Sequence, residues 1–188
     1  MVAEVALQKM TVAEFREMEL DDNDTSLLEL INGEVFRRSA PTPRHQELLS
    51  ELNDLIKAHV KTNQSGKVYF ATIDVFLNNY TAVQPDLVFV PTDQLAMITT
   101  NGIEGVPALI VEIVSPSSIV RDRQVKYEVY EQAGVAEYWL VDPANQEIEV
   151  YQWQQQRYVL LSAASAIEGT LASAVLPGFV LDLKTLFA

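Results

Sequence analysis

Two apolar runs with few polar interruptions dominate the middle of the chain. They occupy residues 83–90 and 108–114, and residues 67–77 and 137–141 form two further candidate strands. Continuous apolar runs are typical of strands covered on both faces, whereas half-exposed strands alternate apolar and polar positions. The pattern therefore predicts an α/β arrangement in which other elements cover both faces of a sheet.

Apolar positions at helical spacing predict two longer helices around these strands. The first spans residues 43–61, with Pro43 in its first position, where the missing N–H costs nothing. The second is expected to begin at residues 116–118 and to end at Gly134, because glycine readily takes the positive φ of a helix C-terminus.

The N-terminal region predicts a short acidic helix followed by a β-hairpin. Residues 11–18 begin with a capping-box pattern, and the polar turn 21–24 follows them. Residues 27–31 and 34–38 flank Asn32-Gly33, a dipeptide suited to a two-residue turn because both positions tolerate positive φ.

The C-terminal region predicts an antiparallel β extension. Its strands are expected at residues 147–153, 157–162 and 179–183, with residues 142–145 as the first turn. The core order is then helix, three strands, helix, strand. We expect one domain over 1–188, made of an acidic helical segment (1–26), the core (27–142) and the extension (143–188).

Composition narrows the classes of protein. The chain has 188 residues, 48% of them hydrophobic and 21% charged, which suits one globular domain. It has no cysteine, so disulfides and thiolate metal sites are excluded. No basic N-terminal signal and no apolar stretch of about 20 residues is present. We therefore expect a soluble cytoplasmic protein that does not enter membranes.

The charge is unevenly distributed. The net charge is −13, which is unfavourable for binding a polyanion. However, residues 1–34 hold nine acids against two bases, whereas residues 35–70 hold six bases against three acids. The second region is either an ordinary solvated face or a weak phosphate-facing patch. Tight, sequence-independent DNA binding by a monomer is not expected.

Two carboxylates lie inside or beside the apolar strands. Asp86 follows Pro85 at the start of one run, and Glu112 lies within the other. Burying an unpaired carboxylate costs several kcal/mol, so such acids are usually paired, protonated or bound to a cation. Asp86 could instead be satisfied by backbone donors, and Glu112 by an arginine such as Arg121 or Arg123. With Lys126 on the following helix, they suggest a divalent-metal site that cleaves phosphodiesters.

The order of motifs resembles a known family. The matching stretches are residues 32–34, 43–46, 84–88, 111–117, 121–126, 130–143 and 176–179. Together they resemble the Uma-two family of restriction-endonuclease-like proteins, within the PD-(D/E)XK nuclease superfamily. The resemblance implies a restriction-endonuclease-like core, Asp86 and Glu112 as ligands of Mg²⁺ or Mn²⁺, and DNA as the substrate of a hydrolytic endonuclease.

One position departs from the superfamily pattern. The lysine expected two residues after Glu112 is Val114, and residues two apart on a strand point to the same face. The resemblance implies that Lys126, on the following helix, replaces it. The alternative for Lys126 is a surface lysine paired with Asp122, one helical turn away.

Further residues are candidates for lining the cleft, and rival functions stay open. The candidates are Glu34, His45, Gln84 and Tyr130, although Glu34 could be a simple hairpin charge and His45 a boundary histidine. The chain could instead be a nuclease-fold binding or regulatory module without activity, or a phosphohydrolase of small nucleotides. A homodimer whose basic faces converge would also reconcile the acidic charge with DNA.

Overall fold

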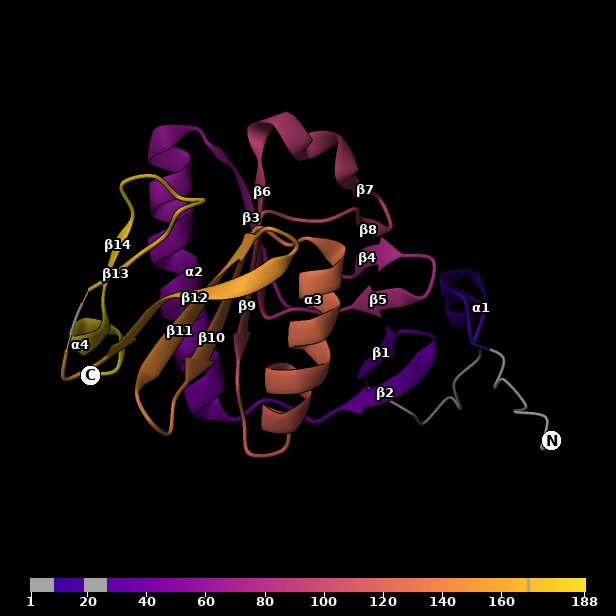
Figure 1. Cartoon of the computed structure of the whole chain (residues 1–188), viewed down its shortest axis with the longest axis horizontal. Coiled ribbons are helices and arrows are strands. Elements are labelled where there is room, and N and C mark those ends of the chain that lie inside the picture. The colour runs from indigo at the N-terminus through magenta and orange to yellow at the C-terminus, as the bar shows by residue number, and fades with distance from the viewer. Residues whose placement is uncertain (1–8, 19–26, 169) are drawn as a thin grey trace.

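A mixed β-sheet forms the centre of the protein. The computed structural model describes residues 9–18, 27–168 and 170–188. The larger sheet has the strand order β12-β11-β10-β9-β6-β3 (Figure 1). Its strands are β3 (Gly66–Phe70), β6 (Leu87–Pro91), β9 (Leu109–Ile113), β10 (Glu137–Asp142), β11 (Glu147–Gln154) and β12 (Arg157–Ser165).

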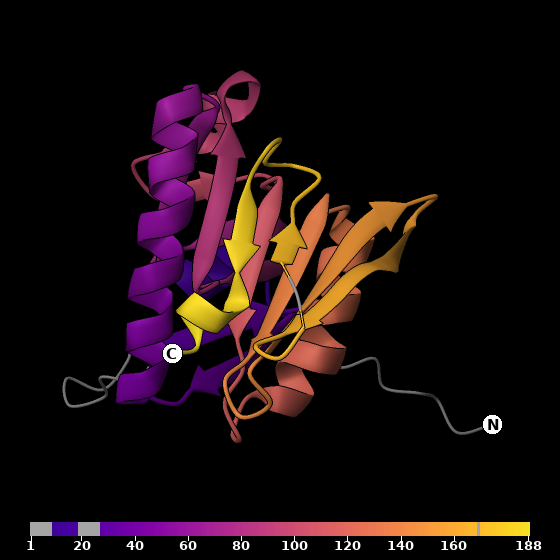
Figure 2. The same ribbon diagram turned by 90° about the vertical axis from the view of Figure 1, so that its left-hand side faces the viewer.

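Both faces of the central strands β6, β9 and β10 are buried, as the continuous apolar runs predict. Alternate residues of β6 point to opposite sides: Leu87 and Phe89 join the cluster that contains the apolar face of helix α2 (Pro43–Asn63). Val88 and Val90 join the cluster on the other side, which contains helix α3 (Tyr127–Ala133). Figure 2 shows α2 and α3 on opposite sides of the sheet. The α/β fold class and the core order of helix, three strands, helix and strand are confirmed.

A second sheet was not predicted. Its strand order is β2-β1-β5-β4-β8-β7. Its strands are β1 (Leu27–Ile31), β2 (Glu34–Arg38), β4 (Val75–Asn78), β5 (Thr81–Val83), β7 (Ile98–Thr99) and β8 (Gly102–Glu104). The 3-10 helix η1 (Thr92–Met97) leads from β6 into it.

The prediction of one strand each at residues 67–77 and 83–90 is therefore wrong, because each range contains parts of two strands. Residues 67–77 divide into β3 in the larger sheet and β4 in the second sheet, and residues 83–90 divide between β5 and β6 in the same way. Pro85 lies at the second crossing, where its lack of an N–H prevents regular strand pairing. The crossing places Asp86 between the two sheets.

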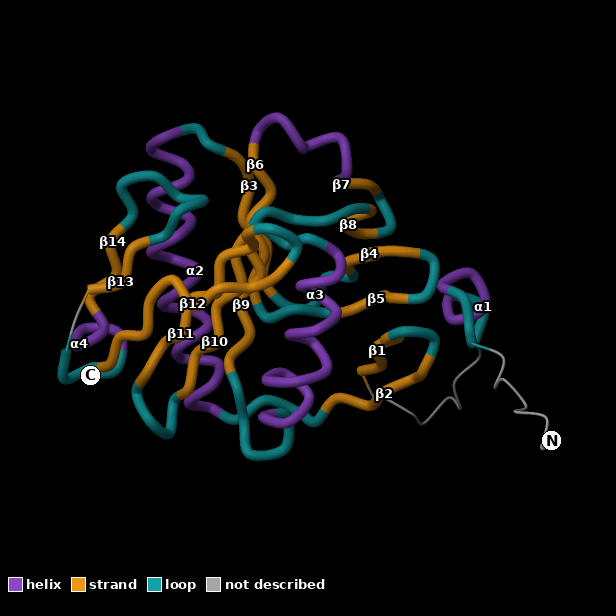
Figure 3. The backbone as a smooth tube through the Cα atoms, in the orientation of Figure 1, coloured by secondary structure: helices purple, strands orange, loops and turns teal. Residues whose placement is uncertain are grey.

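The N-terminal hairpin is confirmed with its register. Ile31 pairs with Glu34 across the turn, and Asn32 and Gly33 have φ values of 53° and 85°. Helix α1 (Val12–Arg16) is shorter than predicted but carries the expected capping box of Thr11. Hydrogen bonds place it beside the turns of the β1–β2 and β4–β5 hairpins (Figure 3). The predicted turn at 21–24 lies outside the described residues.

The two longer helices differ in how well their starts were predicted. Helix α2 begins at Pro43, as expected, and Gln64 caps its end in the left-handed conformation. The second helix does not begin at 116–118, which form a turn. It contains a π-helical segment, η2 (Arg121–Lys126), that continues into α3 and ends at Gly134 with φ 81°. Segments of this kind often occur at functional sites.

The C-terminal extension is confirmed in part. β11 and β12 extend the larger sheet, whereas β13 (Thr170–Ala172) and β14 (Val180–Asp182) form a separate pair. Helix α4 (Leu183–Leu186) follows and was not predicted. No helix in the described part of the chain is long and apolar enough to cross a membrane.

Candidate active site

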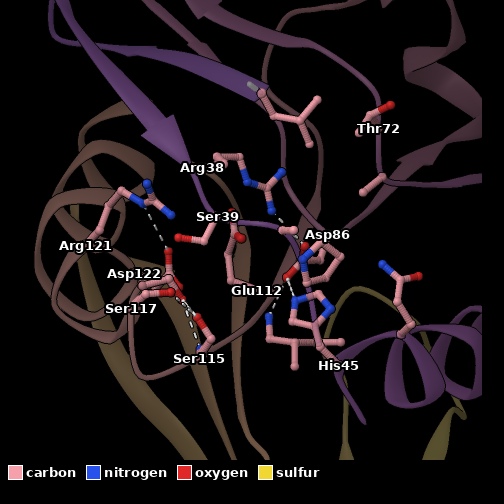
Figure 4. Close-up of a pocket in the computed structure, with 17 residues that line it drawn as sticks. Arg38, Ser39, His45, Thr72, Asp86, Glu112, Ser115, Ser117, Arg121 and Asp122 are labelled. Carbon is pink, nitrogen blue, oxygen red and sulfur yellow. Dashed lines mark hydrogen bonds and ion pairs between the residues drawn. The ribbon is translucent and has the colours of Figure 1, made fainter. Parts of the chain in front are cut away.

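A polar pocket opens where the two sheets meet at the N-terminal end of α2. Its volume is about 100 Å³. Charged and titratable side chains from both sheets and both flanking helices line it, and Figure 4 shows them gathered around the opening. They are Arg38, His45, Asp86, Glu112, Arg121 and Asp122.

Asp86 is held by three partners. Its Oδ1 lies 3.0 Å from Arg38 Nη2, and its Oδ2 lies 3.1 Å from His45 Nε2 and accepts the N–H of Ile113 at 2.8 Å. Thr42, the N-cap of α2, accepts the N–H of His45 and so fixes the first turn beside Asp86. Two of the three partners are side chains, so backbone donors alone do not satisfy this carboxylate.

These contacts decide the ionisation of Asp86. Burial alone would raise its pKa, but the hydrogen bond and charge of His45, the charge of Arg38 and the N–H of Ile113 hold the pKa below its ordinary value. Burial lowers the pKa of His45 and its contact with Asp86 raises it, with a net increase. Asp86 is therefore a carboxylate anion at neutral pH.

Glu112 belongs to a buried chain of charges. Its Oε1 accepts a hydrogen bond from Lys126 Nζ at 2.8 Å and another from Tyr130 Oη at 2.7 Å. Lys126 Nζ also lies 2.8 Å from Oε1 of Glu29 on β1. Since both Lys126 and Glu29 are completely buried, the lysine bridges two carboxylates away from water.

Burial and the charge of Lys126 or of its two acidic partners shift the pKa values of these three side chains in opposite directions. Burial, together with the nearby acids, raises the pKa of Glu112 to about 8, although Lys126 opposes the shift. Burial would lower the pKa of Lys126, but Glu112 and Glu29 raise it above its ordinary value. Burial would raise the pKa of Glu29, and Lys126 and Arg38 lower it. Lys126 is a permanent cation, whereas Glu112 can carry a proton near neutral pH.

Asp122 adds a third carboxylate to the pocket. It lies in the π-helical segment and is almost fully buried, and its Oδ1 accepts no hydrogen bond in the part of the chain that the structure describes. Arg121 Nε lies 3.9 Å from that oxygen and 4.0 Å from Glu29 Oε2. Burial raises the pKa of Asp122 in spite of Lys126 nearby. An unsatisfied buried carboxylate oxygen is costly unless a cation or a donor meets it.

The donor set is compatible with a hard divalent cation but does not form a closed cage. No group of three or more His, Cys, Asp or Glu side chains arranged to hold a metal ion exists among the described residues. Magnesium needs only one or two carboxylates, because it usually keeps several waters. Asp86 and Glu112 meet that requirement at the pocket, and Asp122 offers the free oxygen.

The structure brings most of the predicted site residues together. Asp86, Glu112 and His45 line the pocket, and Lys126 contacts Glu112 from behind. Lys126 is not the surface lysine of the alternative interpretation. The cationic partner of Glu112 is Lys126 and not an arginine. Arg123 instead pairs with acids of β10 and β11.

Three further candidates have different positions. Tyr130 is buried and reaches the site only through Glu112. Gln84 supports the network, since its N–H binds Glu29 and its carbonyl accepts from Arg38, but it does not line the pocket. Glu34 does not line this pocket. It is exposed at the hairpin turn, four residues of extended strand, about 13 Å, from Arg38 at the pocket.

Sequence reasoning missed three charged residues of this site. Glu29 carries the same signal as Glu112, an acid between apolar residues on both sides, in Leu27–Ile31. Asp122 was considered only as a partner for Lys126. Arg38 had no local signal, because its role depends on the hairpin meeting the other sheet.

Comparisons with known proteins agree with this fold. No curated protein matches the chain. A crystal structure from Anabaena variabilis ATCC 29413, described as "a putative nuclease belonging to DUF820", matches with a TM-score of 0.75 and 20% sequence identity. The match covers 95% of this chain and 97% of that one and shows a shared fold. The model of the Uma2 family, described as "Putative restriction endonuclease", matches residues 12–184, and the chain therefore belongs to the Uma2 family.

Proposed function

We propose that this protein is a metal-dependent nuclease that hydrolyses phosphodiester bonds in DNA, with Asp86, Glu112 and Lys126 as its catalytic residues. The observation that carries the proposal is the meeting of Asp86 and Glu112 at one pocket, with a buried lysine hydrogen-bonded to Glu112. The nuclease fold and membership of the Uma2 family support it.

The carboxylates would hold the cation. Asp86 and Glu112 are the proposed ligands of Mg²⁺, with Mn²⁺ as a substitute. A bound divalent cation supplies polarisation of the phosphate and activation of an attacking water. Its charge would also favour loss of the proton that Glu112 can carry, since metal binding to a carboxylate competes with protons. Arg38 and Arg121 line the pocket and would pair with the phosphate oxygens.

Lys126 would act as a fixed positive charge and not as a base. Its raised pKa means that the neutral amine is not available near neutral pH. Two of its three N–H donors are used by Glu29 and Glu112. It therefore orients Glu112 and adds positive potential behind the carboxylate that faces the phosphate, where electrostatic stabilisation is most effective.

The test is cleavage of supercoiled plasmid and single-stranded DNA by purified protein with Mg²⁺ or Mn²⁺, followed on gels. We expect metal-dependent cutting by the wild type and a loss of at least about 100-fold in Asp86→Asn and Glu112→Gln, the scale seen when a key electrostatic group is removed. Glu34→Gln is the matched control, because it removes an exposed acid outside the pocket. The proposal fails if the wild type does not cut, or if the site variants cut as well as the control.

A further inference from the structure

A second groove lies between the C-terminal half of α2 and strand β3. Its volume is about 310 Å³. Lys57 and Lys61 border it from the helix and Lys67 from the strand, while Val60 and Val68 also line it. We call these three lysines and the space between them the lysine groove.

The three lysines are exposed and have no acidic partners in the described part of the chain. None of them makes an ion pair with a described residue, although Asp54 lies one helical turn before Lys57. Between described residues, ion pairs with acids involve the bases Arg16, Arg38, Arg44, Arg121, Arg123 and Lys126. In a chain of net charge −13, three unpaired cations at one groove form a local positive surface.

The elements that form the groove also lead to the catalytic pocket. Along α2, Lys57 and Lys61 lie 12 and 16 residues after His45, or about 18 and 24 Å at 1.5 Å per residue. Along β3, Lys67 lies four residues, or about 13 Å, before Ala71, which lines the pocket. Figure 1 shows α2 running the length of the larger sheet.

The spacing suits a DNA backbone. Phosphates of one strand are about 3.4 Å apart along the duplex axis, so about 13–24 Å corresponds to 4–7 base pairs. The Debye length is about 10 Å at 0.1 M salt, so the three lysines act on phosphates close to the groove and charges farther away are largely screened.

We propose that the lysine groove binds the phosphate backbone of duplex DNA on one side of the cleavage site. This binding function rests on DNA being the ligand in the proposed function, but it does not depend on catalysis. The groove supplies the sequence-independent affinity that the acidic surface elsewhere lacks, and it orients the duplex across the pocket.

The test measures binding without cleavage. Fluorescence anisotropy of a labelled 24-base-pair duplex is recorded in EDTA over a range of salt concentrations. The variant replaces Lys57, Lys61 and Lys67 with glutamine. The matched control replaces the exposed bases Lys9, Arg157 and Lys184 with glutamine, so both variants lose three positive charges. Thermal unfolding of each protein checks that it is folded.

We expect the groove variant to bind at least tenfold more weakly at low salt, while the control stays within about threefold of the wild type. The slope of log K against log salt should fall by about 2 to 3, because each lost phosphate contact contributes about 0.9. Asp54→Asn should bind more tightly than the wild type, because it removes the acid beside Lys57.

Three results would overturn the inference: equal losses in both variants, no loss in the groove variant, or no binding by the wild type. Failure of the proposed nuclease activity is a separate result, because it is measured as the absence of metal-dependent cutting. A wild type that binds through the groove without cutting would keep this inference and reject the catalytic one.

Discussion

The contacts of Lys126 lead to a quantitative prediction about stability. Lys126→Met keeps a side chain of similar length but removes the ammonium that lies 2.8 Å from both Glu29 and Glu112. All three side chains are buried, so water cannot replace the lost partner. Breaking a buried ion pair by removing one member costs about 3–5 kcal/mol. For a chain of this size, 1 kcal/mol shifts Tm by about 2–4 °C, so a fall of about 6–20 °C is expected.

The loss of stability should increase with pH. At low pH, Glu112 can take a proton and become neutral, because burial and the nearby acids already raise its pKa to about 8. Without Lys126, which opposes the increase, the pKa of Glu112 rises further. As the pH increases, the variant must therefore either keep a buried proton on Glu112 at a growing cost in free energy or ionise it beside Glu29 with no cation between them. Thermal unfolding followed by circular dichroism at pH 6 and pH 9 measures both effects. A Tm within about 3 °C of wild type at both pH values would refute the argument.

A second substitution separates folding from chemistry. In Lys126→Met/Glu29→Gln, one of the two unpaired acids is gone, so part of the stability should return, with a coupling of about 0.5–3 kcal/mol. Cleavage should remain absent, because the positive charge beside Glu112 is still missing. If the double variant regains both stability and cleavage, Lys126 has only a structural role.

Three further predictions concern pH, the third carboxylate and the cation. Glu112 and His45 both have raised pKa values, so the folded state binds protons more tightly than the unfolded chain, and the free energy of unfolding without metal should fall as pH rises from about 5 to 8. Urea unfolding should show a flatter pH dependence in Glu112→Gln. Asp122→Asn should reduce Mn²⁺ affinity by about 10–100-fold in calorimetry with little loss of Tm, and an unchanged affinity would exclude Asp122 from the cation site. Mg²⁺ at 100 times its Kd should stabilise the wild type by about 2.7 kcal/mol but not Asp86→Asn/Glu112→Gln, and an equal effect on both would locate the cation elsewhere.

Local patterns were sufficient to predict most elements of the fold. The Asn32-Gly33 turn, the start of α2 at Pro43 and the stop at Gly134 depend on backbone preferences of a few neighbouring residues, and all three were confirmed. Burial of both faces of the central strands followed from the apolar residues of β6 and β9, in which Glu112 is the one charged residue.

The division into two sheets could not be predicted in the same way. Residues 67–77 have strand character throughout, but which sheet each half joins depends on partners far away in the sequence. Phe70 pairs with Leu87 in one sheet, whereas Val75 pairs with Val83 in the other. Pro85 was a usable signal for the second crossing, since a strand interior rarely accepts proline.

Contacts between residues that are far apart in the sequence also explain why only part of the site could be predicted. Asp86 and Glu112 were identifiable because an acid among apolar residues needs a partner. Lys126 could be named, but its burial and its second contact with Glu29 depend on how β1 packs against the helix after β9. The pKa of Glu112 follows from this packing and not from its sequence neighbours.

The second sheet supplies much of the electrostatic environment of the proposed catalytic residues. Asp86 lies where the chain crosses between the sheets, and its Oδ1 partner, Arg38, comes from β2. Lys126 is bound on one side by Glu112 of the larger sheet and on the other by Glu29 of β1. A lysine two residues after Glu112 would lie on the strand itself, but Val114 packs into the core there, so the cation must come from a helix. A lysine that is buried between the helix and the two sheets needs negative charges around its ammonium group. Glu29 supplies one of them and Glu112 the other. The departure from the nuclease pattern at Val114 and the acid on β1 are thus two parts of one arrangement.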